Sequence, residues 1–238
     1  MRKIKFVKGG IYHIFNRGVE KRNIFQDDAD RWRFLQGLYL FNDDGNSTNI
    51  LWRLENERGG LNFKTLKNFV EKESRERKPL VKIMADCLMS NHYHLILQEV
   101  EDNGVSTFMH KIGTGYTGYF NKKHGRVGGL FQGTFRAVPV KMDLYLQYLL
   151  VYLNVVNPGE LVEPKLKERG VKNIDLVIKF ATEYPWSTHQ EYLKKRDSII
   201  IDKGLLGDFF PTRAKYREFA KNILLAKKFE TINHLSLE

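Results

Sequence analysis

Short stretches of alternating apolar and polar residues recur along the chain and predict β-strands. Residues 10–16 alternate β-branched and aromatic residues with polar ones, which is typical of a strand. Residues 81–88 and 92–100 are two further runs of this kind, and the short turn between them predicts a hairpin. Residues 135–140 predict a fourth strand, in which Pro139 marks an edge or an end.

Helical periodicity separates and follows these strands. Asp27 can cap a helix whose apolar positions continue to Leu40. Residues 42–79 form an insertion, in which turn-forming residues precede a charged helix. A later helix should stop at Asn157-Pro158-Gly159. In total, helices are predicted over residues 27–40, 61–77, 105–121 and 143–156, with a basic helical tail over 213–228.

The order of these elements predicts the fold class. Strands of antiparallel type alternate with helices that would cover one face of the sheet. This favours an α+β fold over a doubly wound parallel sheet.

Charge and composition narrow the class of protein further. The 39 Lys and Arg residues exceed the 28 Asp and Glu residues, so the net charge is +11. Such a charge indicates a polyanionic partner, with simple solubilisation as the alternative. The 42% hydrophobic and 13% aromatic content excludes intrinsic disorder as the main state.

Cysteine and hydropathy indicate the compartment. The single Cys87 excludes an intramolecular disulfide framework and any multi-cysteine metal site. The basic N-terminus lacks the apolar stretch of a signal peptide. The most apolar segment, residues 144–156, is too short to span a bilayer. We therefore expect a cytoplasmic protein that does not enter a membrane.

Positive charge is concentrated between His110 and Met142, where there is no Asp or Glu. Aromatic residues and seven glycines are interleaved with the cations, a composition typical of a single-stranded nucleic-acid groove. Ordinary surface charge remains the alternative for single members. After the first strand, Arg17, Lys21 and Arg22 either lie beside the histidine pair described below or solvate a loop. The cations of the acid-free stretch are Lys111, Lys122, Lys123, Arg126, Arg136 and Lys141.

His92 and His94 stand two residues apart in a predicted strand, so both side chains should point to one face of the sheet. Two neighbouring imidazoles can chelate a metal ion, although such pairs also occur incidentally. Two ligands do not complete a coordination shell, so a third ligand and the substrate would have to contribute.

Tyr145, Tyr148 and Tyr152 share one side of a predicted helix. They are either a packed aromatic stripe or include a nucleophile, and spacing does not decide between the two. The sequence has no phosphate-binding loop of the NTPases, no dinucleotide fingerprint and no hydrolase elbow. No nucleotide cofactor is therefore expected.

Four blocks in this order resemble the IS200-like tyrosine transposases of the HUH superfamily, and most closely the branch associated with repetitive extragenic palindromes. The resemblance covers about residues 8–160, so we expect a core domain over 1–160 and a C-terminal extension, possibly DNA-binding, over 161–238. The blocks are Tyr12-His13-Ile14-Phe15-Asn16-Arg17-Gly18 followed by Ile24-Phe25 with Asp30-Arg31, then Met89-Ser90-Asn91-His92-Tyr93-His94-Leu95, then Gly129-Leu130-Phe131-Gln132-Gly133, and finally Tyr152 with Asn157-Pro158.

The resemblance implies a ferredoxin-like or RRM-like sheet on which His92 and His94 bind Mg²⁺ or Mn²⁺. It implies that Tyr152, with Tyr148 in reserve, attacks a DNA phosphate and forms a 5′-phosphotyrosine. It also implies an amide metal ligand four residues after the nucleophile, where this chain has Val156. Asn157, five residues on, serves only if the helix end is irregular, and Asn154 or water is the alternative.

The sequence thus predicts a metal-dependent endonuclease and strand transferase that acts on single-stranded, hairpin-bearing DNA and works as a monomer rather than a homodimer. The DNA contacts are expected from Arg17 and from the acid-free stretch. A non-catalytic RRM-like module that binds nucleic acid is the first alternative. A metal phosphohydrolase that uses water in place of tyrosine is the second.

Overall fold

The computed structural model describes residues 4–45, 53–54, 62–72 and 76–226. Its four strands form one antiparallel sheet in the order β2-β3-β1-β4. With a helix after β1 and another after β3, this is the βαββαβ order of ferredoxin-like folds, and the predicted α+β class is confirmed. The strands are β1 (Ile11–Arg17), β2 (Val81–Met89), β3 (His92–Glu99) and β4 (Arg136–Pro139), and Pro139 lies on an edge strand as predicted.

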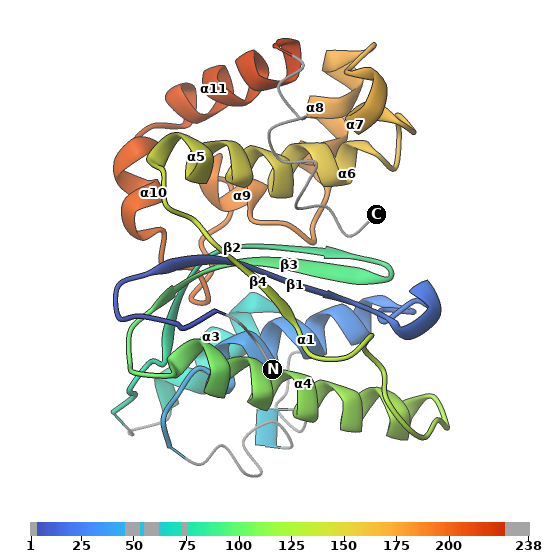
Figure 1. Cartoon of the computed structure of the whole chain (residues 1–238), viewed down its shortest axis with the longest axis vertical. Coiled ribbons are helices and arrows are strands. Elements are labelled where there is room, and N and C mark those ends of the chain that lie inside the picture. The colour runs from blue at the N-terminus through green and yellow to red at the C-terminus, as the bar shows by residue number, and fades with distance from the viewer. Residues whose placement is uncertain (1–3, 46–52, 55–61, 73–75, 227–238) are drawn as a thin grey trace.

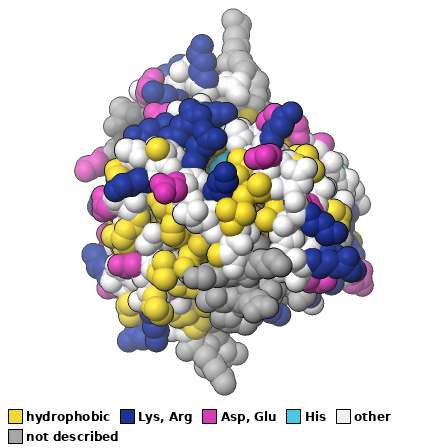
Figure 2. Space-filling model, turned by 90° about the horizontal axis from the view of Figure 1, so that it is seen from above, with side chains coloured by type: hydrophobic (Ala, Val, Ile, Leu, Met, Phe, Trp, Pro, Cys, Tyr) yellow, Lys and Arg dark blue, Asp and Glu magenta, His cyan; other side chains and the backbone are white. Residues whose placement is uncertain are grey.

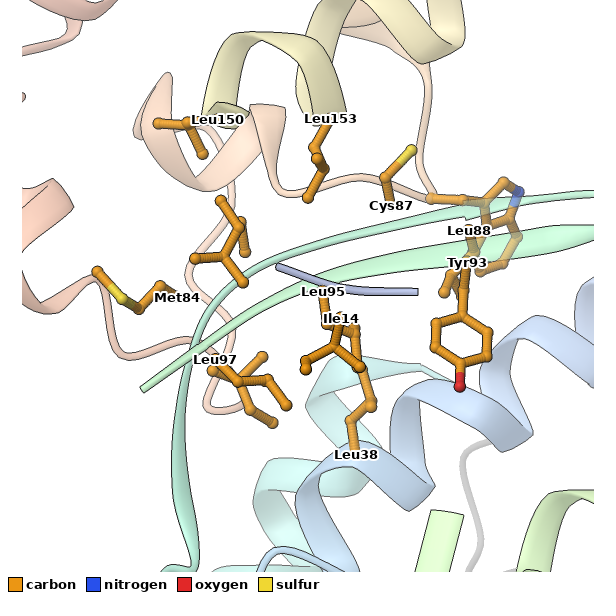
Figure 3. Close-up of a cluster of buried hydrophobic side chains, with 14 of the residues drawn as sticks. Ile14, Leu38, Met84, Cys87, Leu88, Tyr93, Leu95, Leu97, Leu150 and Leu153 are labelled. Carbon is orange, nitrogen blue, oxygen red and sulfur yellow. The ribbon is translucent and has the colours of Figure 1, made fainter. Parts of the chain in front are cut away.

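The two helices of the core, α1 (Asp28–Leu40) and α4 (Gly104–Lys123), cover one face of the sheet (Figure 1). The carboxylate of Asp27 caps α1 by accepting a hydrogen bond from the backbone N–H of Asp30. Tyr93 and Leu38 point into the core between this layer and the sheet (Figure 3). The inward-facing apolar residues of the strands therefore fix which way each strand faces.

The insertion contributes helix α3 (Phe63–Lys72). The predicted helix over 61–77 is longer than this, and residues 61 and 73–75 lie outside the described part of the chain. Residues 76–77 are not helical, because Arg77 turns back to α1, where its guanidinium lies 3.7 Å from the centroid of the Tyr39 ring.

The second face of the sheet is covered by the chain that follows β4 (Figure 1). Helix α5 (Asp143–Val151) continues as a π-helical segment, η2 (Tyr152–Val156), and as α6 (Asn157–Gly159). The helix ends at Gly159, within the predicted stop, but it runs three residues beyond the predicted last residue, Val156, because the π turn carries it past Pro158. The remaining helices are α7 (Leu166–Arg169), α8 (Ile174–Glu183), α9 (His189–Tyr192), α10 (Gly204–Phe209) and α11 (Arg213–Leu225).

The C-terminal extension packs directly on strand β2. The backbone N–H of Leu88 donates to the carbonyl of Trp186 at 2.8 Å, and the Tyr192 hydroxyl donates to the carbonyl of Met84 at 2.9 Å. These bonds satisfy groups of an edge strand that would otherwise face solvent. None of the helices in the described ranges has the length and apolar character needed to cross a bilayer.

Candidate active site

The histidine pair lies on the sheet face that the C-terminal helices cover. Tyr93 points toward α1 (Figure 3), and neighbouring side chains of a strand point to opposite faces. His92 and His94 therefore share the other face, where their ring centroids are 5.0 Å apart at 87°. The prediction that the two imidazoles are side by side is confirmed.

Hydrogen bonds orient both imidazoles. His92 Nδ1 lies 2.6 Å from the Asn91 side-chain oxygen, which only accepts, so the proton is on Nδ1 and Nε2 is the basic nitrogen. His94 Nδ1 lies 2.9 Å from Nε2 of His13 on β1. If His94 donates in this bond, its Nε2 is also basic.

Burial keeps the His94 and His13 rings neutral. It lowers the pKa of His94 well below its ordinary value, and it lowers the pKa of His13 to about 3. Neutral imidazole is the form that binds a metal ion, so no proton competes at His94 near pH 7.

A cavity of about 80 Å³ joins the pair to the tyrosine helix. The Tyr152 ring meets the His94 ring edge to face, with centroids 6.0 Å apart. Tyr152 itself is only 1% exposed. The cavity thus brings together β1, β3, η2 and α7, through Arg17, Lys21, Asn91, His92, His94, Tyr152 and Lys167.

The other two tyrosines of the helix have packing roles. Tyr148 stacks on Phe219 of α11, with ring centroids 5.7 Å apart and an interplanar angle of 16°. Burial raises the pKa of Tyr145 to about 12, and neither residue lines the cavity. Of the three candidates, Tyr152 is the one that faces the histidines.

The helix that carries Tyr152 departs from regular α-helical geometry between Tyr152 and Asn157. This is the irregular helix end on which the predicted role of Asn157 depends. The backbone N–H of Asn157 donates to the carbonyl of Tyr152, five residues back, and closes a π turn. A single π turn inserts one residue into a helix, so Asn157 takes the place that the fourth residue after Tyr152 has in a regular helix. Single π turns are common at functional sites.

Asn157 is 1% exposed, and neither atom of its amide has a hydrogen-bond partner within the part of the chain that the structure describes. Asn154, the alternative ligand, instead accepts from the Thr188 hydroxyl at 2.9 Å and donates to the Tyr216 hydroxyl at 3.1 Å. An unpartnered buried amide is costly unless something binds it.

These residues fit a metal ion held by two imidazoles. Both rings line one cavity. Asn157 does not line it, but its buried amide lies five residues after Tyr152 and has no hydrogen-bond partner in the described chain. The described residues contain no group of three or more His, Cys, Asp and Glu side chains that could hold a metal ion. The remaining ligands would therefore be an amide, water or the substrate.

The acid-free stretch of the sequence meets acidic and carbonyl groups in space. Lys123 pairs with Asp27 at 2.7 Å and with the buried Asp30 at 2.8 Å. Lys111 donates to two backbone carbonyls of the turn at residues 43–45. Both lysines thus have structural partners on the sheet face opposite the histidine pair.

The other residues predicted to contact DNA differ from these two lysines in exposure and in their neighbours. Lys122 and Arg136 are exposed, and Arg126 lies over the ring of Phe120. Arg17 lines the cavity and donates to the Gln132 side chain, which places the glycine-rich loop beside the site. Figure 2 shows the face of the molecule that is formed by the helices after β4. On this face, Lys and Arg side chains gather around a visible His side chain.

A tight loop after β1 brings Lys21 to the cavity. A Cβ at Gly18 would lie 2.2 Å from the carbonyl oxygen of Arg22, so this close approach requires glycine. Glu20 and Lys21 both have positive φ, at 55° and 57°, a strained conformation for residues with a side chain. The sequence left open where Arg17, Lys21 and Arg22 lie: the first two line the cavity, and Arg22 pairs with Glu20 instead.

Two side chains of the site, His13 and Lys167, were not predicted from the sequence. His13 alternates with the buried Ile14, which could have placed it on the histidine face once the register of β1 was known. Lys167 gave no signal, because it lies in the C-terminal extension and reaches the cavity only through the packing of α7.

Comparison with known proteins finds a similar solved structure but no matching family. No family model matches this chain, and no curated protein matches it. Among solved structures, the fold is similar to that of a REP-associated tyrosine transposase bound to a REP hairpin, with a TM-score of 0.46 and 11% identity over 85% of this chain and 93% of that one.

Proposed function

We propose that this protein is a metal-dependent endonuclease and strand transferase for single-stranded DNA, with Tyr152 as the nucleophile. The observation that supports this most directly is the cavity in which one phenol meets two imidazoles and three cations. A phenol attacks a phosphate, imidazoles bind a divalent ion, and cations bind the phosphate. No other cluster in the described residues combines these groups.

His92 and His94 would hold the metal ion through Nε2, and the Asn157 amide is our proposed third ligand. A bound Mg²⁺ or Mn²⁺ supplies Lewis-acid polarisation of the scissile phosphate. Imidazole is a better ligand for Mn²⁺ than for Mg²⁺. The chain itself supplies the orientation of the two rings by Asn91 and His13, and burial keeps the His94 ring neutral.

In the proposed reaction, the Tyr152 Oη attacks the phosphorus and forms a P–O bond. The bond from phosphorus to the 3′ oxygen breaks, the phenol proton passes to solvent, and the 3′ oxygen takes a proton as it leaves. The phosphate ester is retained on the tyrosine, so attack by another 3′-OH rejoins the strand without ATP. Arg17 and Lys21 would hold the phosphate in line for attack.

The proposed substrate is hairpin-bearing single-stranded DNA bound by a monomer. Arg17 at the cavity and the exposed Lys122 and Arg136 would contact its backbone. Lys111, Lys123 and Arg126 have structural partners, so we propose a smaller role for them in DNA binding. DNA binding by residues 161–238 remains a prediction.

One experiment tests the function against its alternatives. The protein is incubated with end-labelled hairpin DNA and Mn²⁺, and the products are separated in denaturant. We expect a protein–DNA band that resists denaturant and is absent in chelator. Binding without cleavage would indicate the RRM-like module, and free phosphate ends without an adduct would indicate a phosphohydrolase.

Replacing His13 should weaken metal binding, although His13 acts through His94 and is not itself a proposed ligand. His13→Leu removes the group that orients His94 Nδ1, so His94 can move its proton to Nε2 and lose its metal lone pair. We expect Mn²⁺ affinity, measured by calorimetry, to fall about tenfold to hundredfold.

Two variants control this prediction. His13→Gln keeps an oxygen that can accept from His94, so it should lose less affinity than His13→Leu. His110→Leu removes an exposed histidine on α4 and should have no effect. An unchanged Mn²⁺ affinity in His13→Leu would contradict the proposed role.

A further inference from the structure

Lys167 is a buried cation at the proposed nucleophile. It is 9% exposed and lines the same cavity as Tyr152, His92 and His94. Its Nζ lies 5.2 Å from the centroid of the Tyr152 ring. Lysine is seldom buried to this degree, so this position has to be explained.

The fold holds Lys167 in place through its backbone. The N–H of Lys167 donates to the Glu160 carboxylate at 2.6 Å, and the preceding Leu166 is completely buried. Lys165, at the start of α7, has a positive φ of 69°, which turns the chain back toward the tyrosine helix. The C-terminal extension is therefore built to bring this side chain to the cavity.

Lys167 places a positive charge in the cavity of the proposed reacting groups. The cavity is lined by two more cations, Arg17 and Lys21, and by no carboxylate of the described chain. Such a set of side chains favours an anion between the histidines and the tyrosine.

We infer that Lys167 is a catalytic residue that binds the scissile phosphate and stabilises the negative charge that develops there as Tyr152 attacks. This inference rests on the proposed function. The ammonium keeps its protons throughout, while the P–Oη bond forms and the bond to the 3′ oxygen breaks as described above. A fixed cation in a buried site is worth far more to the transition state than one in water.

The test compares the rate of adduct formation with DNA affinity in Lys167→Ala. Single-turnover reactions use the full chain, labelled hairpin DNA and Mn²⁺. We expect the rate to fall about a hundredfold, with little change in the dissociation constant for the same DNA. Propylammonium, which can enter the space left by the side chain, should recover part of the lost rate, and KCl at equal ionic strength should not.

Matched variants separate charge from packing. Lys172→Ala removes an exposed lysine of the same extension and should behave as wild type. Lys167→Arg keeps the charge and should keep more activity than Lys167→Ala, and it carries the test if the alanine variant does not fold. A loss in Lys167→Arg as complete as that in Tyr152→Phe would indicate a packing role and overturn the inference.

Different results overturn the proposed function and the role of Lys167. Wild-type protein that forms no adduct overturns the proposed function, and this inference falls with it. A full rate in Lys167→Ala, with an adduct that still depends on Tyr152, overturns this inference alone. A rate that falls only in proportion to DNA affinity also overturns it, because Lys167 would then only bind DNA.

Discussion

The Tyr152→Phe variant is expected to form no covalent adduct with DNA and to bind the same hairpin with nearly wild-type affinity. The substitution removes only the hydroxyl, so the ring keeps its buried position against His94 and beneath Lys167. Loss of the nucleophile should lower the cleavage rate at least about a thousandfold. A denaturing gel with labelled DNA measures the adduct, and a filter-binding titration measures affinity.

Tyr148→Phe is the matched control, because it makes the same chemical change one helical turn earlier. Tyr148 stacks on Phe219 rather than facing the cavity, so we expect adduct formation close to wild type. An adduct that survives in Tyr152→Phe and disappears in Tyr148→Phe would move the nucleophile to Tyr148. One that survives in both would end the tyrosine mechanism.

His92→Ala and His94→Ala should each abolish cleavage that depends on a metal ion. Each removes one of the two imidazoles that the strand places side by side, and a single imidazole does not chelate. We expect Mn²⁺ affinity, measured by calorimetry, to fall at least about a hundredfold, which is the upper range for loss of a supporting residue. Cleavage that continues at full rate in chelator would exclude the metal mechanism.

Two further variants sharpen this result. His110→Ala removes an exposed histidine on α4, beyond the opposite face of the sheet, and should keep wild-type affinity. Asn157→Ala tests the proposed third ligand: we expect weaker Mn²⁺ binding without loss of the fold, because the amide has no partner within the described protein. Unchanged affinity in Asn157→Ala would leave only the two imidazoles as protein ligands.

The positions of the strands, and the fact that His92 and His94 share one face of the sheet, depend on local geometry. Alternation along a strand puts His92 and His94 on one face wherever that strand lies, and the buried Tyr93 confirms it. Helix α1 likewise begins at the predicted cap, where Asp27 binds the backbone N–H of Asp30. Such features need only neighbours in sequence, and the chain specifies them directly.

The charges of the predicted DNA groove depend on long-range contacts. Lys111 and Lys123 stand in a stretch without acidic residues, yet Lys123 pairs with Asp27 and Asp30 in space. Sequence distance hid these carboxylates, which α1 brings next to α4. The number of unpaired cations on a surface therefore cannot be counted from one segment of the sequence, because carboxylates from distant segments pair with some of them.

The end of the tyrosine helix is a feature that the sequence pattern did not specify. Asn157 follows Tyr152 by five residues, and regular helical geometry would point the two side chains in different directions. The π turn between them is a feature of the packed helix, and it shifts Asn157 by one position. A pattern based on 3.6 residues per turn does not contain that information.

Periodicity and residue chemistry were enough to predict the four strands, the antiparallel class, the histidine pair and the three candidate tyrosines. The packed structure was needed to show which tyrosine faces the histidines, that His13 orients His94, and that Lys167 enters the cavity from α7. These depend on strand register and on how distant helices pack, which are set by burial across the whole chain.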